Sequence, residues 1–165
     1  MPAEYLFVDE WDVSAPIGAV FAALSDVETY PTWWTPTYLE ARSDGPPGPG
    51  RVSQERFKAR LPYTLSTTSR IVAWDPARRF EIEVTGDLRG HGAWSLSERE
   101  GGRVHVRFDW RVHADRALLR VLTPVLRPVF RWNHDQAIRR AMAGLEPYAL
   151  RQRDEVAERL PAQRA

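Results

Sequence analysis

Hydrophobic and polar residues alternate with a period of two along most of the first two thirds of the chain. The clearest case is RVHVRFDWRVH, residues 103–113, in which valine and aromatic residues alternate with charged residues and histidines. Such alternation predicts antiparallel strands that bury one face and expose the other. We therefore expect a sheet of about six or seven strands. The segments with this period are residues 4–13, 37–43, 51–59, 64–74, 78–86, 92–98 and 103–113.

Glycine and proline mark the connections between these segments. GPPGPG, residues 45–50, is too rich in both for anything except a turn or loop, and the pair Gly101–Gly102 predicts a two-residue hairpin. GDLRGHG, residues 86–92, lacks the strand–loop–helix context of a phosphate-binding loop. We interpret it as a strand connection with a bulge.

Two short helices are expected directly after the first strand. Pro16 is a helix-start signal for the apolar segment IGAVFAALSD. Asp26 is placed to cap a second short helix, which we expect Pro31 to end. Trp33 and Trp34 then follow in a loop. One of them is expected to pack as a structural plug and the other to act as a gate, and the sequence does not distinguish them.

The hydrophobic spacing becomes helical from Ala117 onward. Pro124 and Pro128 predict a short helical piece, followed by a long helix that begins close to Pro128. Gly144 and Pro147 predict a kink or break near residue 145.

The resulting order is a strand, two short helices, several antiparallel strands and one long helix, which is an α+β arrangement. We expect one domain over residues 1–165, in which residues 152–165 form a loosely ordered tail or an extra helical turn. A highly curved sheet with a single long helix leaves a gap between them, which either side chains or a ligand must fill.

Composition narrows the functional classes. The net charge is +1, so nothing points to nucleic acid, and the absence of cysteine excludes disulfides, zinc–thiolate sites and thiol nucleophiles. The N-terminal MPAEYLFVDEW is no signal peptide, and no apolar run approaches the roughly 20 residues that span a bilayer. We expect a cytoplasmic protein without metal or other cofactor, and leave open whether it is a monomer or a homodimer.

An arginine stripe accompanies the apolar segment LLRVLTPVLRPVF. This stripe is typical of a solvated face, although it would also permit a transient membrane contact during ligand pickup. Its members are residues 116, 120, 127 and 131.

Large apolar residues on the inward strand faces are candidates for a pocket lining, because the chain contains 7 tryptophans. Such residues either close-pack as core or line a ligand site with a few polar groups. The candidates are Trp11, Val13, Phe80, Ile82, Val84, Trp94, Leu96, Phe108 and Trp110.

The segment TLSTTSRIVAW carries polar residues on both faces, so alternation does not show which face is buried. An outward Arg70 would be solvated. An inward Arg70 could hold a carbonyl or enolate oxygen, but a buried guanidinium needs an acid, a hydroxyl network or a ligand. The two faces are Thr64, Ser66, Thr68 and Arg70 on one side, and Leu65, Thr67, Ser69 and Ile71 on the other.

Asn133 and His134 lie on or beside the apolar stripe of the long helix. His134 follows Phe130 by four residues, and Asn133 precedes Ala137 by four. His134 is either a satisfied core histidine or a group at the polar end of a pocket. The alanines at 137 and 141 leave room below Asn133, as a cavity wall requires.

These features together resemble a known family. The order of elements, VSAPIGAVFAALSDVETYPTWW after the first strand, DPARRF at a hairpin and RWNHDQAIRRAMAGL in the late helix look like the START-like superfamily. The resemblance is closest to its polyketide cyclase/dehydrase branch and covers most of the chain, from residue 5 to residue 150. Its most specific part is the pattern APxxxVFxxLSDVExYPxWW.

The resemblance implies a helix-grip fold, in which a curved antiparallel sheet wraps round a long C-terminal helix and leaves an apolar cavity. Members of that family bind lipids, polyketides, sterols or aromatic compounds, and only some are enzymes. Aromatic polyketide cyclases keep a cavity arginine on one strand with a hydroxyl two residues before it, and Arg70 and Thr68 match these places. They also place an asparagine at the level of Asn133.

Three functions remain in view. The first is binding of one hydrophobic, partly oxygenated small molecule in an internal cavity. The second is an aldol-type cyclisation or dehydration, in which Arg70 would stabilise an enolate oxygen, Asn133 orient a carbonyl and His134 move a proton. The third is a non-catalytic module whose cavity is filled by its own side chains. The expected ligand contacts are Trp33, Trp34, Thr68, Phe80, Ile82, Trp94, Phe108, Trp110, Phe130 and Ala137.

Overall fold

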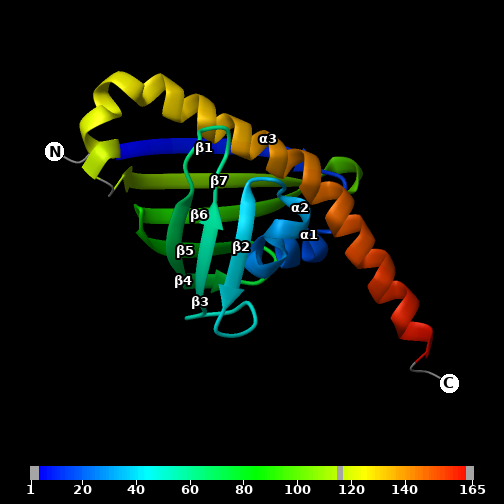
Figure 1. Ribbon diagram of the computed structural model, residues 1–165. Coiled ribbons are helices and arrows are strands. Elements are labelled where there is room, and N and C mark those ends of the chain that lie inside the picture. The colour runs from blue at the N-terminus through cyan, green and yellow to red at the C-terminus, as the bar shows by residue number, and fades with distance from the viewer. Residues whose placement is uncertain (1–3, 115–116, 163–165) are drawn as a thin grey trace.

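Seven strands of the described residues form one antiparallel sheet (Figure 1). The computed structural model describes residues 4–114 and 117–162, with side chains for residues 4–113 and 127–157. The strand order is β1-β7-β6-β5-β4-β3-β2, so β1 and β2 are the edges of the sheet. The strands are β1 (Glu4–Val13), β2 (Tyr38–Ser43), β3 (Val52–Phe57), β4 (Leu65–Asp75), β5 (Arg79–Gly86), β6 (Leu88–Arg99) and β7 (Arg103–Ala114).

The alternation predicted for residues 103–113 is confirmed on β7. Val104, Val106, Phe108 and Val112 are buried on the inner face of the sheet. The neighbouring strands β1 and β6 pair with β7 along almost their whole length, in antiparallel register. Burial of one face therefore sets the register of this half of the sheet.

The segment GDLRGHG is largely strand, which corrects its interpretation as a connection. Leu88 to Gly92 belong to β6 and pair with β7, and Gly90 to Gly92 pair with β5 as well. A Cβ atom on Gly90 would lie 2.0 Å from the carbonyl oxygen of Arg111. Glycine is therefore present because the β7 backbone approaches closely, not because the strand ends there.

Three short helical elements follow β1: α1 (Ile17–Ser25), the 3-10 turn η1 (Val27–Thr29) and α2 (Tyr30–Trp33). Pro31 lies in the first turn of α2, where a missing N–H costs no intrahelical hydrogen bond. The expectation that Pro31 ends a helix is therefore wrong. Trp33 and Trp34 are buried, with 4% and 5% exposure, instead of lying in an open loop.

The C-terminal helix α3 (Ala117–Ala162) is continuous over 46 residues. The expected breaks at Pro128 and near residue 145, and the expected separate helical piece before Pro128, are therefore wrong. An interior proline costs a hydrogen bond, but burial of an apolar stripe along the helix offsets that cost. The stripe consists of Ile138, Ala141, Leu145 and Ala149.

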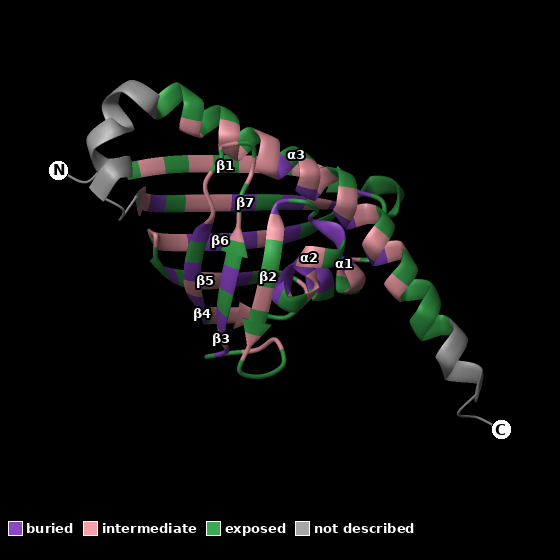
Figure 2. Cartoon of the chain, viewed as in Figure 1, coloured by how far each residue is buried: buried purple, intermediate pink, exposed green. Residues whose placement is uncertain are grey.

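Beyond this stripe, α3 extends past the body of the protein (Figure 2), and residues 153–157 are exposed. The segment expected to form a loose tail or an extra turn remains helical to Ala162. No helix within residues 4–114 and 117–162 is long and apolar enough to cross a membrane.

Gly144 marks a very close approach between α3 and α2. A Cβ atom placed on Gly144 would lie 1.8 Å from the carbonyl oxygen of Trp33. About two turns earlier, the Trp34 indole Nε1–H donates a hydrogen bond to the Ala137 carbonyl oxygen at 2.7 Å. Contrary to the prediction from the sequence, Gly144 does not break the helix. It allows the backbones of α3 and α2 to touch.

Replacing Gly144 with alanine should lower the free energy of unfolding by about 1–3 kcal/mol, the usual cost of overpacking. The added methyl group overlaps the Trp33 carbonyl unless α2 and α3 move apart. Urea unfolding followed by circular dichroism measures the change. Gly18→Ala in α1 is the matched control, because open space surrounds Gly18 and alanine favours helix. Equal stability of the two variants would contradict the close approach.

Candidate functional site

Two adjoining chambers lie between the sheet and α3. The inner chamber has a volume of about 110 Å³ and the outer one about 120 Å³. Residues from α1, η1 and α2 close the inner chamber at one end. The two chambers share a set of wall residues, which we call the junction: Thr37, Phe57, Trp110, His134 and Ala137.

Aromatic side chains form most of the inner chamber's wall. Trp94 and Phe108 stack with their ring centroids 4.1 Å apart, and Phe80 stacks on the other side of Trp94 at 6.4 Å. The alternation of β5, β6 and β7 predicted that these rings face inward, and the structure places them there. The expected contacts that line this chamber are Trp34, Phe80, Ile82, Trp94, Phe108, Trp110 and Ala137.

The outer chamber lies between α3, the β1–β7 side of the sheet and the loop that joins β3 to β4. Phe130 and Ala137, both expected as ligand contacts, line it. Its other apolar walls are Tyr5, Phe7, Phe57, Tyr63, Leu65, Leu88, Trp110 and Val112.

The two adjacent tryptophans have different roles, which the sequence left open. Trp34 lines the inner chamber and is tied to α3 by its indole hydrogen bond to Ala137. Trp33 packs behind it, with ring centroids 5.6 Å from Trp34 and 6.1 Å from Tyr148, and does not line either chamber. Trp33 is the plug, so its assignment as a ligand contact is wrong.

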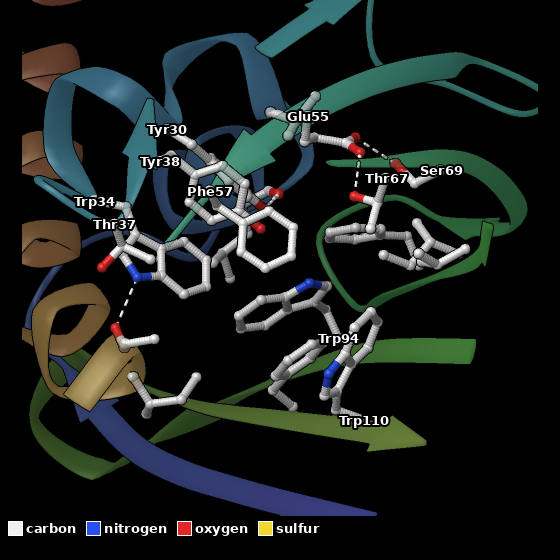
Figure 3. A pocket seen from close by; sticks show the side chains of 18 of the residues that line it. Tyr30, Trp34, Thr37, Tyr38, Glu55, Phe57, Thr67, Ser69, Trp94 and Trp110 are labelled. Carbon is white, nitrogen blue, oxygen red and sulfur yellow. Dashed lines mark hydrogen bonds between the residues drawn. The ribbon is translucent and has the colours of Figure 1, made fainter. Parts of the chain in front are cut away.

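Glu55 forms a polar end of the inner chamber and is 5% exposed. Its Oε1 accepts hydrogen bonds from the hydroxyls of Ser53 at 2.7 Å and Ser69 at 2.5 Å, and its Oε2 accepts one from Thr67 at 3.0 Å. Figure 3 shows the hydrogen bonds from Ser69 and Thr67 to Glu55 as dashed lines. Strand pairing assembles the cluster, since Ser53 lies opposite Ser69 and Glu55 opposite Thr67 in the β3–β4 ladder.

Burial raises the pKa of the Glu55 carboxyl above its ordinary value. The three hydroxyl hydrogen bonds and the positive charge of Arg51 act in the opposite direction, but the loss of water outweighs them. Glu55 therefore holds its proton to a higher pH than a free glutamate does. A protonated carboxyl at this position can donate a hydrogen bond or a proton to a ligand oxygen.

Arg51 and two tyrosines surround the same end of the chamber. The Arg51 Nη1–H donates to the carbonyl oxygen of Ser25 at 2.7 Å, which ties β3 to the end of α1. The Tyr30 hydroxyl donates to the carbonyl oxygen of Leu24. Burial raises the pKa of both Tyr30 and Tyr38, so both phenols stay neutral.

Arg70 and Thr68 lie outside the cavity. Arg70 is exposed, and its Nη2–H donates to Glu83 Oε2 at 3.1 Å on the outer face of the sheet. The opposite face of β4 points inward because it carries Leu65 and Ile71, whose burial determines the strand's orientation. The family resemblance implied a cavity arginine at position 70 and a cavity hydroxyl at position 68. Both expectations are wrong, because these side chains lie on the outer face of the sheet.

Asn133 lines the outer chamber and anchors a loop. Its Oδ1 accepts hydrogen bonds from the backbone N–H groups of Arg60 at 2.7 Å and Leu61 at 3.0 Å. This contact holds the β3–β4 loop against α3. The Asn133 oxygen thus already accepts two hydrogen bonds within the protein, so only its NH₂ group is available to donate to a ligand carbonyl.

His134 belongs to the junction and lines both chambers. Its Nε2 lies 2.7 Å from Asp9 Oδ2, and its ring stacks on Phe7 with centroids 3.8 Å apart. The Asp9 carboxylate therefore orients the imidazole. When Nε2 carries the proton, Nδ1 is the acceptor.

Sequence reasoning missed Glu55 and Arg51. Both faces of residues 51–59 carry polar or charged side chains, so the period of two gave no preferred inner face. The one available signal was Phe57, which shares a face with both of them. Because the buried partners of Glu55 come from β4 as well as β3, only the strand pairing reveals the cluster.

Ionisation of Glu55 should destabilise the fold. Because its folded pKa lies above the ordinary value of 4.5, the stability it contributes is fully present below about pH 4.5 and is lost as pH rises through the folded pKa. Glu55→Gln removes this titration. The free energy of unfolding of the wild type, minus that of the variant, should thus fall as pH rises. Urea unfolding at several pH values measures it, and a difference that rises with pH would contradict the raised pKa.

Comparison with known proteins gives a family and a fold. The family model described as polyketide cyclase / dehydrase and lipid transport matches residues 7–149. A protein from Thermus thermophilus has a similar structure, with a TM-score of 0.76 and 17% identity over 90% of this chain and 99% of that one. No protein of curated function matches the sequence.

Two further solved structures show the same fold. For the Zhui aromatase/cyclase from Streptomyces sp. R1128 the TM-score is 0.73, with 15% identity over 91% of this chain and 96% of that one. A point mutant of Thalictrum flavum norcoclaurine synthase gives 0.62, with 10% identity over 93% and 98%. The seven-stranded curved sheet, two short helices and long C-terminal helix are a helix-grip fold, and the chain belongs to the polyketide cyclase/dehydrase and lipid-transport family.

Proposed function

We propose that the chain binds a hydrophobic, partly oxygenated small molecule, such as a polyketide, lipid or aromatic compound, in the two joined chambers. The observation that carries this proposal is the buried Glu55 cluster, which places a carboxyl and three hydroxyls at the end of an aromatic-walled cavity. An apolar body would lie against the rings, and an oxygen would meet the polar end. Apolar walls with a few convergent polar groups are the usual form of a small-molecule site.

The arrangement of polar groups supports a ligand over a filled core. A core that is merely structural has no need to bury a carboxyl, since this costs free energy unless its hydrogen bonds are made. Here the carboxyl stays beside open space and keeps a raised pKa. A ligand oxygen would add the missing partner.

A second candidate function is acid–base catalysis of an aldol cyclisation or dehydration, as in an aromatase/cyclase. Two titratable groups favour it: Glu55 and the His134–Asp9 pair both face the inner chamber or its junction. A protonated carboxyl can donate to a carbonyl oxygen while an oriented imidazole accepts a proton from the adjacent carbon. Asn133 would contribute through its NH₂ group, and Arg70 has no part because it lies outside.

A solvatochromic apolar dye should bind the wild type at one saturable site. Ala137→Phe should abolish this binding, because Ala137 lines both chambers and a phenyl ring there fills the junction. Ala143→Phe is the matched control: Ala143 is exposed on the same helix, so binding should be retained. Fluorescence titration measures both. Failure of the wild type to bind, or equal binding by all three proteins, would favour a cavity filled by side chains.

Acid–base chemistry predicts exchange of an α-proton in a bound ketone. Acetophenone is an aryl ketone of suitable size, and its displacement of the dye establishes that it binds. In D₂O the protein should accelerate deuterium incorporation at the methyl carbon, observed by NMR. Glu55→Gln should reduce the acceleration at least about 100-fold, the low end of what a positioned acid or base contributes. If acetophenone binds but its deuterium exchange is no faster than in buffer without protein, the catalytic proposal is wrong and the binding proposal stands.

A further inference from the structure

One edge of the Arg51 guanidinium has no partner within the part of the chain that the structure describes. Arg51 is 7% exposed and lines the inner chamber. Its Nη1–H donates to the carbonyl oxygen of Ser25, whereas its buried Nε–H makes no hydrogen bond to a described residue. No hydrogen bond to these residues involves Nη2 either. Nε is enclosed by protein atoms, so Nη2 is the donor that a ligand in the chamber can reach, and a carboxylate is the partner that a guanidinium binds most strongly.

The charge of Arg51 also lacks a contacting anion among the described side chains. Asp26 and Glu55 are near enough to feel its positive charge, but neither forms an ion pair with it. The Glu55 oxygens are occupied by the hydroxyls of β3 and β4. A buried cation that is not paired is costly, and an anionic ligand group would remove that cost.

The shape of the inner chamber limits what such a ligand can carry. Its volume of about 110 Å³ is below the roughly 150 Å³ of an engineered apolar cavity that accepts benzene, so one ring is the most that it can hold and a larger ligand also needs the outer chamber. Phe80, Trp94 and Phe108 supply flat apolar surfaces for that ring. Substituents opposite the anion would extend through the junction into the outer chamber.

We propose that the inner chamber binds a one-ring aromatic carboxylic acid, whose carboxylate accepts a hydrogen bond from Nη2 of Arg51 and pairs with its positive charge. The ring lies against Trp94 and Phe80. This inference rests on the proposed function, because it takes the cavity as the ligand site and specifies the polar group that the ligand carries. Glu55 lines the same chamber, and burial of its carboxyl favours the protonated form, which can donate a hydrogen bond to a ligand oxygen.

Displacement of the apolar dye by three matched compounds tests the proposal in the full chain at neutral pH. Benzoate, benzamide and toluene share a ring of similar size but differ in charge and hydrogen bonding. Benzoate should bind roughly 10- to 100-fold more tightly than benzamide, as expected for hydrogen bonds to a charged group. Equal binding of benzamide or toluene would overturn the carboxylate site while leaving the cavity intact. Absence of dye binding itself would remove the proposed function as well.

Variants of β3 and the residue before it provide the second readout. Arg51→Met should reduce the affinity for benzoate to that for benzamide and leave toluene binding unchanged. Arg56→Met is the matched control, because Arg56 is exposed on β3 and pairs with Glu40 outside the cavity. Loss of benzoate binding in both variants, or in neither, would overturn the proposal. If Arg51→Met does not fold, Arg51→Lys keeps the charge without the fork and should weaken benzoate binding several-fold relative to the wild type.

Discussion

The backbone contact between α3 and α2 determines where the long helix lies over the sheet. At Gly144 only a hydrogen atom separates α3 from the Trp33 carbonyl, and the Trp34 indole holds the helix again at Ala137. These ties bring the helix against the tryptophan plug at one end of the molecule. Farther along, the side chains of the curved sheet and α3 do not fill the space between them, and the two chambers remain.

The inner chamber combines strongly apolar walls with two ionisable groups, Glu55 and Arg51, that do not contact each other. Glu55 is surrounded by hydroxyls, and Arg51 is tied to a backbone carbonyl, so neither neutralises the other by direct contact. Burying both without pairing them is unfavourable for stability. Native structures that retain such a conflict generally do so at functional sites. The same conflict therefore links the physical chemistry of β3 to the proposed binding role.

Much of the fold could be predicted from the sequence because strand alternation is a local property. The inward rings of Phe80, Trp94 and Phe108 follow from it directly. The orientation of β4 could not be predicted, since both of its faces carry hydroxyls and burial of Leu65 and Ile71 decides between them only when β3 and β5 are in place. The continuity of α3 through its prolines likewise depends on contacts far away in sequence.

Glu55 shows the same limit at the site. Its three hydroxyl partners include Thr67 and Ser69, which adjoin it only through the register of the β3–β4 ladder. The family resemblance assigned a cavity arginine to position 70, which lies on the outer face of β4, because a matching position in the sequence does not show which face of the strand is buried. Residue type and spacing thus predicted the walls of the cavity, and long-range pairing determined its polar end.

The junction between the chambers has a kinetic consequence. On the helix side, His134 is clamped between the Phe7 ring and the Asp9 carboxylate, so this wall has little freedom to move. A molecule that passes between the two chambers moves along Phe57 and Trp110, so rotation of these two rings changes the width of its path. Its residence time is then governed by the frequency of these ring motions as well as by affinity. A guest of the two chambers can thus be held by slow motion of the walls as well as by the strength of its contacts.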